Sequence, residues 1–249
     1  MHHNLTTSSH ARKSRVKIYE SRLHLFFTFL VIITPFLFLL LFAHFARISR
    51  QELFFDLGAS AARLLVAYII AVILAWLLAI LFYQGRRSLI ALPLFDVLQS
   101  FPTFAVLPLI TYFFRASEAI VVVFLILTVL WPILFSIISS LKLIKHDWEE
   151  AVDMAGLRGW NYIKVFLLPV SVPGLITGSI IGLGEGWEAL IATEIIVGTQ
   201  TGLGEFFRAF STNPTITALG ILGLLLVIFS LNHLVWLPLL DWGHRKMEE

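Results

Sequence analysis

The chain has 249 residues, of which 58% are hydrophobic and only 14% carry a charge, and its mean hydropathy is +0.88. Soluble globular domains contain roughly 25% charged residues, so this chain has too little charge to cover a surface in water. The net charge of +2 excludes the broad basic face of a nucleic-acid-binding protein. The absence of cysteine excludes disulfides, cysteine-bound zinc and a thiol nucleophile. The composition therefore predicts an all-α polytopic membrane protein.

Apolar runs bounded by charged residues predict six transmembrane helices, because a helix needs about 20 mostly apolar residues to cross a bilayer. The runs are residues 23–45, 62–83, 89–114, 119–141, 172–197 and 215–240. The first run is too long for the core of a signal peptide, so we expect it to be retained as a helix.

Lysine and arginine gather on one side of these predicted helices. Thirteen of the 18 basic residues fall in residues 1–22, in the loop after the second helix, in the loop at about 142–171, and in residues 241–249. Basic residues stay on the cytoplasmic side, so we expect both termini and the 142–171 loop to face the cytoplasm. The predicted organisation is a cytoplasmic tail (1–22), a first transmembrane helix (23–45), a core (62–240) and a second cytoplasmic tail (241–249).

The 142–171 loop contains a short predicted helix. Asp147 is suited to cap its start, and Glu150 is suited to the positive end of the helix dipole. Gly156 is suited to a left-handed C-cap. A helix of about two turns is marginal in water unless it packs against a partner.

The short helix carries apolar side chains for contact and small residues for close approach. These residues are Trp148, Ala151, Met154, Ala155 and Gly156. The residues alone leave two interpretations open, a solvated connector and a docking element for a soluble partner.

The spacing within this loop resembles the EAA loop of ABC importer permeases, whose pattern is Glu-Ala-Ala, three residues, Gly, nine residues, Ile-x-Leu-Pro. The corresponding residues are Glu150-Ala151-Val152, Gly156 and Phe166-Leu167-Leu168-Pro169, with Val152 and Phe166 departing from the pattern. Residues 100–109, 173–178, 187–194 and 202–204 resemble segments of the nitrate, sulfonate and taurine type of these permeases.

This resemblance covers the chain from about Ala62 onward and implies a type I ABC importer permease of a bacterial-type inner membrane. Such a permease pairs with a second permease copy, here expected to be identical, two ATP-binding subunits and an external substrate-binding protein. The chain would not be an enzyme and would bind no cofactor, since ATP and Mg belong to the ATPase and no Walker motif is present. Residues 147–169 would couple to the ATPase through Trp148, Glu150, Ala151, Met154, Ala155, Gly156 and Pro169, with Glu150 contacting a basic residue.

Three acidic residues interrupt the fifth apolar run: Glu185, Glu188 and Glu194. An acidic side chain at the centre of a spanning helix costs about 2.5 to 3.5 kcal/mol, so none should face lipid. We expect Glu185 or Glu188 to border a translocation path, and we expect Glu194 to hold neighbouring helices. The alternative is that all three only bind other helices.

Small residues and Trp187 accompany these acids in the fifth run. Gly174, Gly178 and Gly182 share one helical stripe and would let another helix come close. Trp187 lies on nearly the opposite side and is expected to pack between helices.

The third apolar run contains Asp96 and Gln99, which either line a cavity or mark the polar start of the helix. Pro102 and Pro108 are expected to kink this run. No group of His, Asp and Glu has metal-ligand spacing, so no metal site is predicted.

The substrate stays open at this point. Glu185 and Glu188 would repel an anion, which favours a neutral or cationic heterocycle, such as a thiamine or pyrimidine precursor, or an amine. A small organic anion of the sulfonate, taurine or nitrate kind is retained because of the resemblance. The rival function is a secondary transporter or channel that uses the intramembrane glutamates.

Overall fold

The computed structural model describes residues 27–114, 117–236 and 238–239, and every regular element among them is a helix. The helices are Phe27–Ala46, α2 (Arg50–Phe82), α3 (Gly85–Gln99), α4 (Thr103–Phe114), α5 (Glu118–Lys142), α6 (His146–Met154), α7 (Gly159–Tyr162), α8 (Leu168–Val197), α9 (Leu203–Ala209) and α10 (Pro214–Leu231). Two π-helical turns, Ile163–Leu167 and Asn232–Trp236, precede α8 and follow α10. The tails predicted at 1–22 and 241–249 lie outside the described residues.

Five of these helices are long and apolar enough to cross a membrane, and the bent pair α3 and α4 supplies up to one more. The prediction of an all-α polytopic membrane protein is therefore confirmed. The third predicted span is the bent pair α3 and α4, which meet at 72°, so the kink expected at Pro102 is confirmed. The break lies at residues 100–102, where Pro102 removes a backbone donor and restricts the residue before it. The chain stays helical through Pro108 and Pro132.

Two other boundaries differ from the predicted ones. The second helix begins at Arg50 rather than at residue 62, and the fifth span begins at Gly159 rather than at residue 172. The loop expected at 142–171 is consequently short, since only residues 143–145 and 155–158 around α6 lie outside helices. The helical turns between Gly159 and residue 172 were not predicted because Asn161 and Lys164 lower the local hydropathy. Hydropathy reports contact with lipid rather than backbone conformation.

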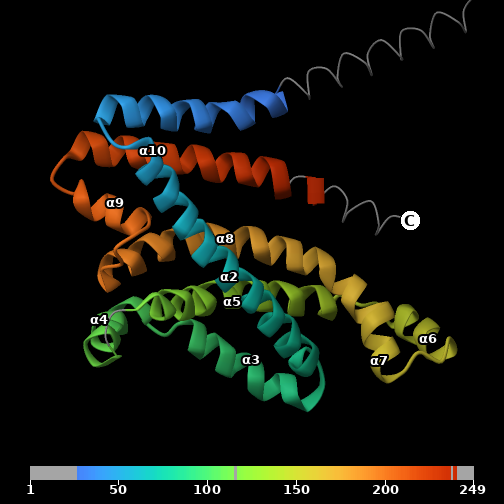
Figure 1. Ribbon diagram of the computed structural model, residues 1–249. Coiled ribbons are helices and arrows are strands. Elements are labelled where there is room, and N and C mark those ends of the chain that lie inside the picture. The colour runs from blue at the N-terminus through green and yellow to red at the C-terminus, as the bar shows by residue number, and fades with distance from the viewer. Residues whose placement is uncertain (1–26, 115–116, 237, 240–249) are drawn as a thin grey trace, which may run out of the picture.

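The core of the molecule is the pair of helices α5 and α8, which lie side by side, with α2 crossing them (Figure 1). The helix Phe27–Ala46 lies along α10, and the Ser230 hydroxyl donates a hydrogen bond to the carbonyl of Val31 at 2.7 Å. The short helices α6 and α7 lie at one end of the bundle, and α4 and α9 lie at the other (Figure 1). The two ends therefore offer separate surfaces, joined by α5 and α8.

A row of glycines brings the backbones of α8 and α5 into direct contact. A Cβ atom on Gly174 would lie 2.4 Å from the carbonyl oxygen of Ser136, and one on Gly178 would lie 2.6 Å from the Cα of Ile133. Real Cβ atoms do not approach other atoms so closely, so any side chain would push the helices apart. The row consists of Gly174, Gly178, Gly182 and Gly186.

Replacing Gly178 by alanine should therefore lower the stability of the fold. Over-packing in a close-packed region typically costs about 1 to 3 kcal/mol, which exceeds the gain of about 1 kcal/mol in helix propensity. Gly184 is the matched control, because it lies in the same helix and a Cβ there meets nothing within 4 Å. Thermal unfolding in lipid nanodiscs should show a lower midpoint for Gly178→Ala and an unchanged or higher one for Gly184→Ala. Equal midpoints would show that the close contact does not limit the packing.

Candidate functional site

The helix α6 begins at His146 and differs from the predicted helix at its first residues. Lys145 occupies the N-cap and makes no side-chain cap bond, so the prediction that Asp147 caps the helix is wrong. Asp147 and Glu149 lie in the first turn, where carboxylates interact favourably with the helix dipole. His146 Nε2 lies 3.2 Å from Glu150 Oε1, one turn further along.

The end of α6 is fixed by a backbone motif that requires glycine. Gly156 has φ +69°, and its N–H donates to the carbonyl of Asp153 at 3.0 Å. The N–H of Leu157 donates to the carbonyl of Val152 at 3.2 Å, which completes a Schellman motif. The chain therefore leaves α6 abruptly and turns into α7 at Gly159.

The outer surface of α6 exposes two large apolar side chains among charged ones. Met154 is 84% exposed and Trp148 is 46% exposed, whereas Val152 is buried. Two neighbours outside α6, Leu143 and Trp160, are also strongly exposed. Sequence reasoning missed these two, although both stand beside the motif. The small residues predicted for close approach, Ala151, Ala155 and Gly156, are exposed as well.

The chain after α6 reaches the membrane helices through a turn of four residues, 155–158, followed by helical turns. The hydroxyls of Tyr162 in α7 and Tyr83 at the end of α2 lie 3.4 Å apart. Pro169 stands in the first turn of α8, directly after the π-helical turn. Because Pro169 has no N–H to donate to the preceding turn, the wider turn suits this position. A displacement of α6 would therefore act on α8 through the turn at residues 155–158 and the helical chain that begins at Gly159.

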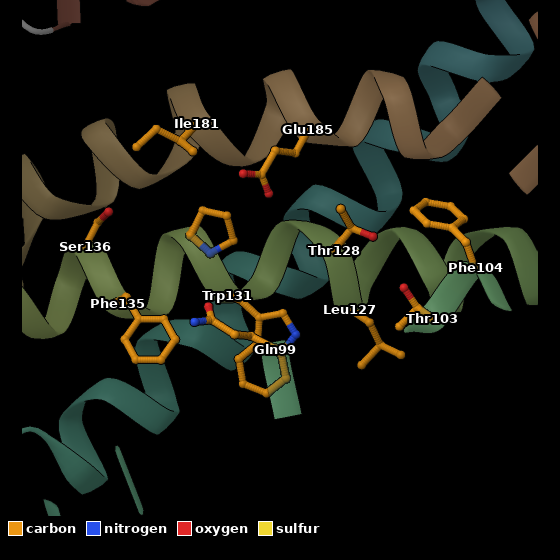
Figure 2. A pocket seen from close by; sticks show the side chains of 11 residues that line it. Gln99, Thr103, Phe104, Leu127, Thr128, Trp131, Phe135, Ser136, Ile181 and Glu185 are labelled. Carbon is orange, nitrogen blue, oxygen red and sulfur yellow. The ribbon is translucent and has the colours of Figure 1, made fainter. Parts of the chain in front are cut away.

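A cavity of about 510 Å³ lies between α5 and α8, near the junction of α3 and α4 (Figure 2). Its lining residues are Gln99, Thr103, Phe104, Leu127, Thr128, Trp131, Pro132, Phe135, Ser136, Ile181 and Glu185. Glu185 is the one charged residue in this lining, and its side chain points from α8 toward α5 (Figure 2). No group of three His, Cys, Asp or Glu in the described part of the chain could hold a metal ion.

The four residues predicted for a translocation path are not equivalent in the structure. Glu185 and Gln99 line the cavity, whereas Glu188 and Asp96 do not. Asp96 instead accepts a hydrogen bond from Gln99 Nε2 at 2.9 Å and so orients the Gln99 side chain. Glu188 is exposed, one helical turn from Glu185.

Glu194 is fully buried at the other end of α8 and binds three neighbours. Its carboxylate accepts hydrogen bonds from Arg63 Nη1 at 2.6 Å, from the Ser60 hydroxyl at 2.8 Å and from the Gly204 N–H at 2.8 Å. Trp187, on the same helix, is also buried. The predicted role of Glu194, holding helices together, matches these contacts, which join α8 to α2 and to the start of α9.

Arg63 is the partner that sequence reasoning missed, although it lies at the edge of the predicted helix 62–83. Because α2 begins at Arg50, Arg63 lies well inside this helix, where it is 7% exposed. Its second nitrogen donates to Glu118 at 2.9 Å. The available signal was a basic residue at the edge of one apolar run together with an acid, Glu194, inside another, which could form an ion pair.

The comparisons with known proteins agree with the arrangement of helices and with the motif around α6. Residues 67–236 match the family described as the inner membrane component of binding-protein-dependent transport systems. The chain belongs to this family. The resemblance to ABC importer permeases of the nitrate and sulfonate type is thereby confirmed, and the protein is a multi-pass component of the inner membrane.

Individual relatives are transport permeases rather than enzymes, as predicted for this chain. The nitrate import permease NrtB of Leptolyngbya laminosa is 32% identical over 72% of this chain and 66% of its own length. The bicarbonate permease CmpB of Synechococcus elongatus is 28% identical over 79% of this chain and 72% of its own length. The taurine permease TauC of Escherichia coli is 30% identical over 45% of this chain and 40% of its own length. The chain thus spans slightly less than two thirds of the nitrate permease. The names of these relatives give nitrate, bicarbonate and taurine, and none supports the predicted heterocycle substrate.

Replacing Glu194 by glutamine should destabilise the end of the bundle where α9 lies. The change leaves the Arg63 guanidinium buried without its closest counter-charge, and breaking a buried pair in this way costs about 3 to 5 kcal/mol. Glu205→Gln is the control, because it breaks an exposed pair with Arg208 that contributes about 1 kcal/mol or less. A large fall in the thermal midpoint is expected for Glu194→Gln alone. Similar midpoints for the two variants would contradict a structural role for the buried pair.

Proposed function

We propose that the chain is the transmembrane permease subunit of an ATP-driven importer for a small solute delivered by an external binding protein. The observation that carries this proposal is the position of α6, a tightly capped helix with exposed apolar side chains, between α5 and α8. These are the same two helices that enclose the cavity. Family membership supports the same function.

In this proposal α6 docks into a groove of a cytoplasmic ATPase. Trp148 and Met154 supply the contact area, and the exposed small residues Ala151, Ala155 and Gly156 allow close approach. Glu150 contacts a basic residue of the groove. ATP and Mg are bound by the ATPase, and this chain binds no cofactor itself. Pro169 and the helix around it pass the displacement to α8.

The α6 end of the molecule is proposed to face the cytoplasm, with both termini on the same side. The basic residues support this orientation, because Arg86 and Arg87 begin α3 and Lys142 ends α5 at the end where α6 lies (Figure 1). Arg208 belongs to α9 at the opposite end, where the external binding protein would dock.

The cavity is proposed to be part of the translocation path, with Glu185 and Gln99 lining it and Glu188 and Asp96 flanking it. A second, identical permease copy would close the path on the open side, and two ATPases would complete the importer. The names of the relatives support a small anion of the nitrate, bicarbonate or taurine kind as the substrate.

The substitution Gly156→Arg tests the docking of α6. The variant should insert into the membrane, but the added side chain would stand on the docking surface and uncouple ATP hydrolysis from uptake. Gly156→Asn is the control, because asparagine tolerates a positive φ and preserves the C-cap. Reconstituted vesicles should show transport by the Asn variant and loss of transport, with reduced capture of the ATPase, for the Arg variant. Normal transport by Gly156→Arg would overturn the docking role.

A further inference from the structure

Glu185 presents an electrostatic problem that the proposed path alone does not solve. It is a carboxylate in a membrane-spanning helix, and within the described residues it has no hydrogen-bond or ion-pair partner. An unpaired acid at such a position costs about 2.5 to 3.5 kcal/mol, so acids of this kind are retained for a ligand or a pathway. None of the other residues lining the cavity is charged. A positively charged group that enters the cavity would supply the missing counter-charge.

We infer that the cavity is a binding site for a small solute that carries an ammonium group, with Glu185 as the counter-charge. This inference rests on the proposed function, because it names the class of substrate that the path accepts. The volume of about 510 Å³ lies within the range of roughly 300 to 1,000 Å³ that holds small ligands.

The aromatic part of the lining favours a cation over an anion. Trp131 and Phe135 of α5 and Phe104 of α4 line the same cavity as Glu185 (Figure 2). The face of an aromatic ring attracts an ammonium group, most strongly for tryptophan. A carboxylate combined with aromatic rings is a suitable environment for an alkylammonium group, whereas a bare anion would be repelled by Glu185.

Neutral donors in the same lining can hold the oxyanion of such a solute. The hydroxyls of Thr103 and Ser136 make no hydrogen bond with other described residues. Gln99 uses one N–H for Asp96 and has a second N–H free. The cavity is thus equipped for a zwitterion, with its ammonium group on Glu185 and its sulfonate or carboxylate on neutral donors. It contains no charge that would stabilise an anion without an amine.

Ligand binding to the complex of permease and ATPase, without the external binding protein, tests this inference. The probes are taurine, ethanesulfonate, which has the same chain and sulfonate but no amine, and nitrate. In nanodiscs, calorimetry should show roughly tenfold tighter binding of taurine than of ethanesulfonate, as expected for one added charge pair. Glu185→Gln should remove this preference, and Glu185→Asp should retain it. Glu52→Gln removes an exposed carboxylate at the start of α2 and should change nothing.

Several results would overturn the inference. These are equal binding of taurine and ethanesulfonate, tighter binding of nitrate, no binding of taurine, or an unchanged taurine preference in Glu185→Gln. The comparison of ligands on the wild-type complex decides the question even if a Glu185 variant does not fold. Stimulation of ATP hydrolysis by the binding protein reports on the proposed function separately, so an importer that accepts amine-free anions would refute only the inference.

Discussion

Direct backbone contact between α5 and α8 is the constraint on which the rest of the structure depends. Glycines at every fourth position of α8 remove the side chains that would otherwise separate the two helices. Because α6 is the connection between them, the contact holds this short helix from both sides. The same contact places Glu185 of α8 in one cavity lining with Thr128 and Ser136 of α5. One packing arrangement therefore sets both the surface at the end of the bundle and the chemistry of the cavity.

The far end of α8 is fixed by different chemistry. There the fully buried Glu194 binds α2 through Arg63 and binds the turn that begins α9. The Arg63 guanidinium continues to Glu118 at the start of α5. Helix α8 is thus attached by close packing near α6 and by an ion pair near α9, with the cavity between. In the proposed coupling, a displacement at the α6 end would reach the cavity through α8, while the buried pair would resist movement at the other end.

Much of this fold could be predicted from the sequence, because membrane helices and glycine caps have local signals. Gly156 ends α6 where the pattern predicts it, and the glycines of α8 lie on one face. Pro102 predicts the break between α3 and α4, whereas the early start at Gly159 is not predicted, because apolar length does not report helices that extend beyond the bilayer. The partner of Glu194 was missed because Arg63 is 131 residues away and only the folded chain brings them together. The cavity likewise combines separate helices, so only its individual residues could be proposed.

The central claim is that motion of α6 reaches the cavity through α5 and α8. Because the chain has no cysteine, Ser136→Cys supplies a single thiol in the cavity lining. The decisive measurement is the rate at which this thiol reacts with a water-soluble methanethiosulfonate reagent. The rate is measured in the assembled complex, with and without ATP. ATP should change the rate, and adding Gly156→Arg should abolish the change. An ATP-dependent change that persists with Gly156→Arg would contradict the central claim.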